Sequence, residues 1–138
     1  MKFELDRDGF VVLERVFSKA DMDAVTARIE TYQKRHEAAI AQRGGTEGIS
    51  RAHEITFTSH LAEHDLELLA FCRRTEIAEL GTALLGPDVD LYWNQAVFKM
   101  PEGAQQFPWH QDDGYTPVSP SPYLTPNLLP IARGKSAG

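Results

Sequence analysis

One long stretch of the chain carries hydrophobic residues at helical spacing. Ser18 can cap the amide groups of a first turn, and the Asp21 carboxylate three residues later favours the positive end of a helix. One apolar stripe then lies on an otherwise polar surface, formed by Met22, Val25, Ile29 and Tyr32. The pattern predicts an amphipathic scaffold helix that begins after Ser18 and runs to Gly44-Gly45, where two glycines end it.

Other segments have the composition of strands. Residues 10–13 (Phe-Val-Val-Leu) follow Gly9, and residues 89–100 are rich in β-branched and aromatic side chains, so each predicts a strand. Pro101-Glu102-Gly103 predicts a turn, and residues 106–115 predict a further extended stretch.

The middle of the chain predicts a loop and two short helices. Residues 46–59 show no firm periodicity and are interpreted as a loop. The first short helix would place Leu66, Leu69 and Cys72 on one face. The second would be capped by Thr75 and stopped by Gly86-Pro87, with an apolar face formed by Ile77, Leu80 and Leu84.

Length and composition limit the class of protein. With 138 residues, 42% of them hydrophobic, the chain can form one modest core, as one domain or part of one. A net charge of -6 without a cluster of Lys or Arg argues against a nucleic-acid or anionic-membrane partner and favours a small-molecule substrate. No stretch resembles a signal peptide or a membrane span, and Cys72 is the single cysteine. We therefore expect a soluble, cytoplasmic protein without an internal disulfide.

The candidate chemistry lies in a His-x-Asp pair. On an extended backbone, His110 and Asp112 would project to the same side, so an imidazole and a carboxylate could bind one metal ion together. The alternative without a metal is that His110 and Asp112 are a hydrogen-bonded pair on a strand. A non-haem Fe(II) oxygenase site needs two histidines and one carboxylate, yet no histidine follows His110. The other four histidines, His36, His53, His60 and His64, all lie upstream in stretches that are interpreted as helix or loop. Three of them, His53, His60 and His64, are interpreted as polar surface or loop residues, one of which could be a substitute ligand.

Three segments of the chain resemble the phytanoyl-CoA dioxygenase family. Residues 5–13 resemble the opening strand of that family, residues 97–100 leading to 109–112 resemble its first metal-binding segment, and residues 123–125 resemble the start of its next core strand. The resemblance implies an α+β fold in residues 1–125, with N-terminal helices packed on an incomplete double-stranded β-helix, a jelly-roll or cupin-like fold. Residues 126–138 depart from the family pattern and are expected to form a divergent, poorly ordered tail.

The resemblance also implies an oxygenase that uses Fe(II) and 2-oxoglutarate. By this comparison His110 and Asp112 are iron ligands, while the candidates for contact with the co-substrate are Lys99, Gln111, Asn94 and Gln95. Lys99 is equally interpreted as a solvated strand residue. The second histidine and the co-substrate arginine of the family have no counterparts here, which predicts a truncated copy whose activity depends on missing residues. The alternatives are a non-catalytic remnant, which could self-associate through open sheet edges, and a small cupin-like metal-binding or ligand-binding module.

Overall fold

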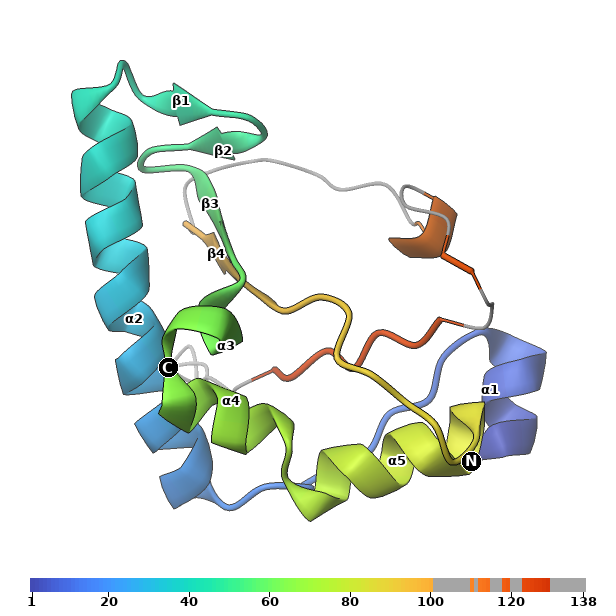
Figure 1. The fold of residues 1–138 in the computed structure, drawn as a ribbon. Helices are drawn as coiled ribbons and strands as arrows, with labels where there is room; N and C mark the ends of the chain where they lie inside the picture. The colour runs from blue at the N-terminus through green and yellow to red at the C-terminus, as the bar shows by residue number, and fades with distance from the viewer. Residues whose placement is uncertain (101–109, 111, 115–117, 120–122, 130–138) are drawn as a thin grey trace, which may run out of the picture.

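The computed structural model describes residues 1–100, 110, 112–114, 118–119 and 123–129, and within them a small antiparallel sheet lies beside the long helix α2 (Lys19–Gln42), with α3 (Leu61–His64) and α4 (Leu66–Cys72) at one end of it (Figure 1). This is the predicted mixture of helix and sheet. The helices are α1 (Lys2–Asp8), α2 (Lys19–Gln42), α3 (Leu61–His64), α4 (Leu66–Cys72), α5 (Thr75–Leu85) and the 3-10 turn η1 (Asp112–Gly114). The strands are β1 (Thr46–Glu47), β2 (Ser50–Arg51), β3 (Ile55–Ser59) and β4 (Gln95–Lys99). The described strands form one open sheet in the order β1-β2-β3-β4, and the expected jelly roll stays a prediction.

The long helix α2 begins and ends as predicted. The Ser18 hydroxyl accepts a hydrogen bond from the Asp21 amide at 3.1 Å, and the Asp21 carboxylate accepts one from the Ser18 amide at 3.2 Å, which together form a capping box. The helix ends before Gly44, whose φ of 103° lies in the left-handed region. None of the helices in the described residues is long and apolar enough to cross a membrane.

The core lies between α2 and one face of the sheet. In the ladder of β3 and β4, Thr56 pairs with Phe98 and Thr58 with Ala96, so these four side chains share a face. The buried residues Leu61, Leu68 and Ala96 form the centre of the core, and the stripe of α2 packs on them together with Phe98 through Val25, Ile29 and Tyr32. The predicted apolar stripe is therefore the face of α2 that packs along the sheet (Figure 1).

The interpretation of residues 46–59 as a loop was wrong, because they form β1, β2 and β3. The first two strands have only two residues each, and Gly48 between them has a φ of 56°. Such short strands have no periodicity to detect. The third strand, with Ile55 and Thr56 buried, is stabilised by β4, which is distant in the sequence.

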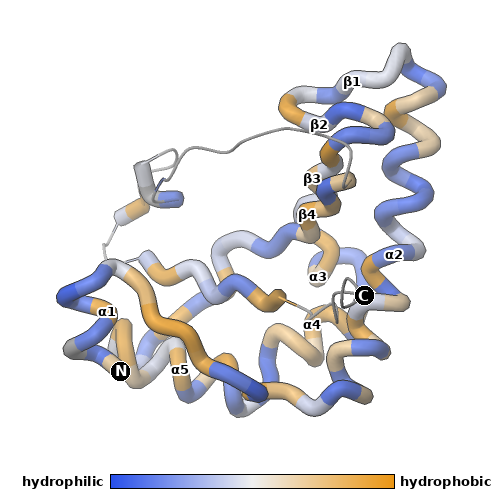
Figure 2. The backbone as a smooth tube through the Cα atoms, turned by 180° about the vertical axis from the view of Figure 1, so that it is seen from behind, coloured by the Kyte–Doolittle hydropathy of each residue, from blue (hydrophilic) through white to orange (hydrophobic). Residues whose placement is uncertain are grey.

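Two predicted strands are absent or shorter than expected. Residues 10–13 form no strand, and in Figure 2 they are a continuous hydrophobic stretch that follows α1. Phe10 and Val12 are largely exposed. A strand needs a ladder partner, and none of the described strands pairs with this segment. The strand predicted over residues 89–100 is limited to β4 for the same reason, because within that stretch only Gln95–Lys99 pair with β3.

The short helices occur where they were predicted, with different details. In α4 the buried residues are Leu68 and Phe71, whereas Leu66, predicted on the apolar face, is largely exposed. The N-cap residue of α5 is Arg74, so Thr75 is the first helical residue and not the cap. Gly86 ends α5 as predicted.

Candidate metal centre

His110 and Asp112 lie close together in the structure. The His110 Nε2 atom is 3.5 Å from the Asp112 Oδ1 atom, and the two side chains are 36% and 38% exposed. The sequence predicted an extended backbone here. The structure differs at residues 112–114, which form the 3-10 turn η1. The approach of the two side chains therefore does not follow from strand alternation alone. Gln111, predicted to contact the co-substrate, lies outside the described residues.

The second carboxylate oxygen of Asp112 has a different partner. The Thr125 hydroxyl donates a hydrogen bond to Asp112 Oδ2 at 2.7 Å. The segment that carries Thr125 also contacts the residues before β4, because the rings of Tyr123 and Tyr92 meet edge to face with centroids 5.9 Å apart. Sequence reasoning assigned no role to Thr125, although it lies in the run 123–125 that resembles a core strand of the family.

The described residues contain no group of three or more His, Cys, Asp or Glu side chains that could hold a metal ion. The upstream histidines have other surroundings. His53 Nδ1 lies 3.2 Å from the Glu37 carboxylate, and His60 Nδ1 contacts the Glu63 carboxylate. The His36 Nε2 atom is buried without a hydrogen-bond partner.

The other predicted co-substrate residues lie at the sheet. The Asn94 side-chain oxygen accepts a hydrogen bond from the Ala62 amide at 2.9 Å and so holds the first turn of α3. The Gln95 side-chain oxygen accepts one from the Trp93 indole at 3.2 Å. Lys99 pairs with Ile55 in the sheet and is exposed. Figures 1 and 2 show η1 set apart from β4, so the structure does not bring these residues next to Asp112.

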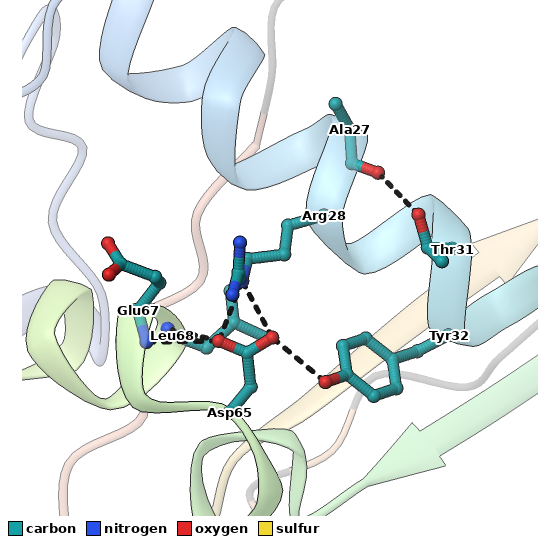
Figure 3. Close-up of polar contacts among 7 residues, drawn as sticks. All are labelled: Ala27, Arg28, Thr31, Tyr32, Asp65, Glu67 and Leu68. Carbon is teal, nitrogen blue, oxygen red and sulfur yellow. Dashed lines mark hydrogen bonds and ion pairs between the residues drawn. The ribbon is translucent and has the colours of Figure 1, made fainter.

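Asp65 is the centre of a separate polar cluster between α2 and α4 (Figure 3). The Arg28 Nε atom lies 2.6 Å from both carboxylate oxygens, and the Tyr32 hydroxyl donates to one of them at 2.8 Å. The amides of Glu67 and Leu68 donate to the other at 3.0 and 3.1 Å. Burial alone would raise the pKa of Asp65, but these donors outweigh it and lower the pKa to about 2. The cluster is a charged N-cap that joins two helices.

A hollow of about 300 Å³ lies beside this cluster, between α2 and α4. Its two cations, Arg28 and Arg74, already have carboxylate partners. Arg28 pairs with Asp65, and Arg74 lies 2.7 Å from Asp21 and 2.6 Å from Glu76. Because these charges are already neutralised within the protein, the hollow offers no uncompensated charge to an anionic ligand, and we interpret these pairs as structural.

Comparisons with known proteins point to one family. The model of the phytanoyl-CoA dioxygenase (PhyH) family matches residues 5–132. Two curated relatives, from Bordetella parapertussis and Bordetella bronchiseptica, are both named ectoine dioxygenase. Each is 30% identical over 112 residues, which cover 78% of this chain and 34% of the relative. The chain thus spans about a third of the length of the curated relatives it matches. No solved structure matches it significantly.

Proposed function

The chain belongs to the phytanoyl-CoA dioxygenase family, and from this premise we propose that it is part of an Fe(II)- and 2-oxoglutarate-dependent oxygenase that hydroxylates a small molecule. The observation that carries the proposal is the approach of the His110 imidazole to the Asp112 carboxylate. The names of the two relatives support a dioxygenase. The substrate stays open, because one fold supports many substrates.

The two side chains fit a shared metal ion. An imidazole nitrogen and a carboxylate oxygen are the donors of the facial site of two histidines and one carboxylate that binds non-haem Fe(II). Two donors at right angles around a metal, with bonds of about 2.1 Å, lie about 3 Å apart. The observed 3.5 Å between His110 Nε2 and Asp112 Oδ1 is close to that separation. A small rotation of either side chain would bring both atoms into range.

Under this proposal His110 binds Fe(II) through a neutral ring nitrogen and Asp112 binds it as a carboxylate. Bound Fe(II), together with 2-oxoglutarate and O₂, supplies the oxidative decarboxylation that is coupled to substrate hydroxylation. The proposed co-substrate contacts are Lys99, whose ammonium suits a carboxylate, and the amides of Gln111, Asn94 and Gln95. Since the structure places Asn94 and Gln95 in other hydrogen bonds, their role requires these bonds to be exchanged.

The activity of the whole protein requires more than the two ligands. A third protein ligand is needed for the facial site, and residues 111–138 contain no histidine. We propose that the open sheet is part of a double-stranded β-helix. We also propose that the protein acts in the cytoplasm, on a small molecule. The outer edges of β1 and β4 have no partner among the described strands, and they could also support self-association.

A second candidate function is a cupin-like module that binds metal or ligand without catalysis. It is favoured by one observation: in the described part of the chain no third His, Cys, Asp or Glu side chain joins His110 and Asp112 to complete a metal site. Such a site would complete its coordination with water, and its affinity for metal would be lower than that of a three-ligand site.

The proposal is tested by anaerobic titration of the purified chain with Fe(II) and 2-oxoglutarate. The expected result is a visible charge-transfer absorption band that is lost in His110→Ala. The matched control is His64→Ala, because His64 lies in α3 and not at the pair. Equal bands in the His110→Ala variant and the wild type would refute the ligand assignment. Binding of Fe(II) without the 2-oxoglutarate-dependent band would favour the cupin-like module.

A further inference from the structure

We propose that Thr125 is a positioning residue that orients the Asp112 carboxylate for metal binding. This inference rests on the proposed function of Asp112 as a ligand. Thr125 itself does not contact the metal under this proposal and acts through the carboxylate.

The two oxygens of the Asp112 carboxylate have different partners. Asp112 Oδ2 accepts the hydrogen bond of the Thr125 hydroxyl at 2.7 Å, whereas Oδ1 faces His110 Nε2 at 3.5 Å. A carboxylate without a partner can rotate and can bind a metal through either oxygen or both. With Oδ2 held by Thr125, Oδ1 is the oxygen directed toward the imidazole.

The hydroxyl acts on the charged form of the ligand. A hydrogen bond to an ionised carboxylate is stronger than one between neutral groups, so it can hold a side chain that is 38% exposed. Carboxylates that bind metals are usually held by such an outer partner, and loss of the partner weakens metal affinity by about 10–100-fold. The geometry at Asp112 has this form.

Thr125 is also well suited to a clean test. It lies 13 residues beyond Asp112, so the bond is not a local turn contact, and Tyr123 in the same segment packs against Tyr92. The Thr125 side chain is exposed and is not part of the described core. Replacement of its hydroxyl should therefore leave the fold intact.

The experiment compares Co(II) binding by the wild type and two variants. Co(II) prefers ligands similar to those of Fe(II) and reports its coordination through visible absorption. Thr125→Val removes the hydroxyl at nearly constant volume, and its affinity for Co(II) should fall by about 10–100-fold with a changed spectrum. Thr125→Ser keeps the hydroxyl and should restore both the affinity and the spectrum. Thr46→Val, at an exposed position of β1, is the control for the substitution itself.

Asp112→Ala distinguishes the ligand role of Asp112 from the positioning role of Thr125. If this variant loses Co(II) binding but Thr125→Val binds like the wild type, the positioning role is refuted while the ligand role of Asp112 stands. If Asp112→Ala binds Co(II) as well as the wild type does, the ligand role fails and the inference about Thr125 falls with it. Weakening in Thr125→Val with rescue in Thr125→Ser supports both.

Discussion

The Asp65 carboxylate shows at the scale of single residues how a buried charge is kept. Its side chain is almost fully buried, yet it remains ionised because Arg28, Tyr32 and two backbone amides donate to it. Burial of a charge is costly unless the charge is paired and hydrogen-bonded. The stability of the protein should therefore depend on the ionisation of this one group.

Acid should destabilise the protein as Asp65 is protonated. Its folded-state pKa of about 2 lies below the value of about 3.9 for an unfolded aspartate, so its contribution is present above pH about 4 and is lost as the pH falls toward 2. Tyr32→Phe removes one donor to the charged form and raises the folded pKa, so this variant should lose less stability over that interval. Thermal unfolding measured between about pH 5 and pH 2 checks this. Tyr92→Phe is the exposed control, and parallel curves for the wild type and Tyr32→Phe would contradict the prediction.

The interface between α2 and β3 contains polar atoms without partners. His36 lies between Tyr32 and Ile40 on the sheet-facing stripe of α2, and its Nε2 atom is buried and unpaired. The hydroxyls of Thr56 and Thr58 on the facing strand are also buried and unpaired. A buried polar atom without a partner lowers stability by about 1–3 kcal/mol.

Thr56→Val should therefore stabilise the protein. The Thr56 side chain is 2% exposed, and valine replaces the unpaired hydroxyl with a methyl group of similar size. We expect the free energy of unfolding to rise by about 1 kcal/mol in urea denaturation. Thr46→Val, the same change at an exposed strand position, should have little effect. Destabilisation by Thr56→Val would instead show that the hydroxyl is hydrogen-bonded in solution, for example to an internal water molecule.

At the scale of elements, the sequence predicted the ends of helices, which depend on neighbouring residues. It did not predict which strands pair, because that depends on residues far apart in the chain. The start of α2 follows from Ser18 and Asp21, and the end of α5 follows from Gly86, because caps and terminating glycines act within one turn. The five-residue ladder of β3 is formed with β4, a strand about 40 residues later, and no local pattern identifies that partner. The segment 10–13 has the composition of a strand but no described partner.

The candidate site divides in the same way. The spacing of His110 and Asp112 is local and predicted that the two side chains lie close together, although it did so from an extended backbone and not from the 3-10 turn found at residues 112–114. The contact between Asp112 and Thr125 joins residues 13 positions apart through a path that no spacing rule gives. The three-dimensional structure is needed to find this hydrogen bond.

Loss of the capping box of α2 should lower the stability of the protein by a measurable amount. Ser18→Ala removes the hydroxyl that accepts from the Asp21 amide and should lower the free energy of unfolding by about 1 kcal/mol. Ser18→Thr keeps a capping hydroxyl and should stay close to the wild type. Urea denaturation followed by circular dichroism at helical wavelengths measures both variants. Equal losses in the two would contradict a role for the cap.

At the scale of the whole molecule, stability depends on a small core. The one large side chain described as fully buried is Ile40, near the end of α2, at 0% exposure. The other buried hydrophobic residues described come from β3, α3, α4 and β4: Ile55, Leu61, Ala62, Leu68, Phe71 and Ala96. A few buried side chains therefore hold helices and sheet together, and each should contribute strongly.

Ile40→Ala should strongly lower the free energy of unfolding. Removal of a buried isoleucine side chain to alanine costs about 2–5 kcal/mol, through lost burial and the cavity left behind. Ile49→Ala is the matched control, because Ile49 is 66% exposed and its loss should change stability by less than about 0.5 kcal/mol. Denaturation midpoints of the two variants provide the comparison. Similar midpoints would show that the packing at Ile40 does not support the fold.

The register of β3 and β4 has a consequence for the order of folding. Ser59 pairs with Gln95, so the ladder closes a loop that contains α3, α4 and α5. Closing this loop costs conformational entropy before the hydrogen bonds and packing of the ladder lower the free energy. Contacts between residues distant in sequence therefore form slowly. Helices that form first inside the loop shorten its effective length. We therefore expect α3 to α5 to fold early and β4 to join β3 late, so that the ladder limits the folding rate.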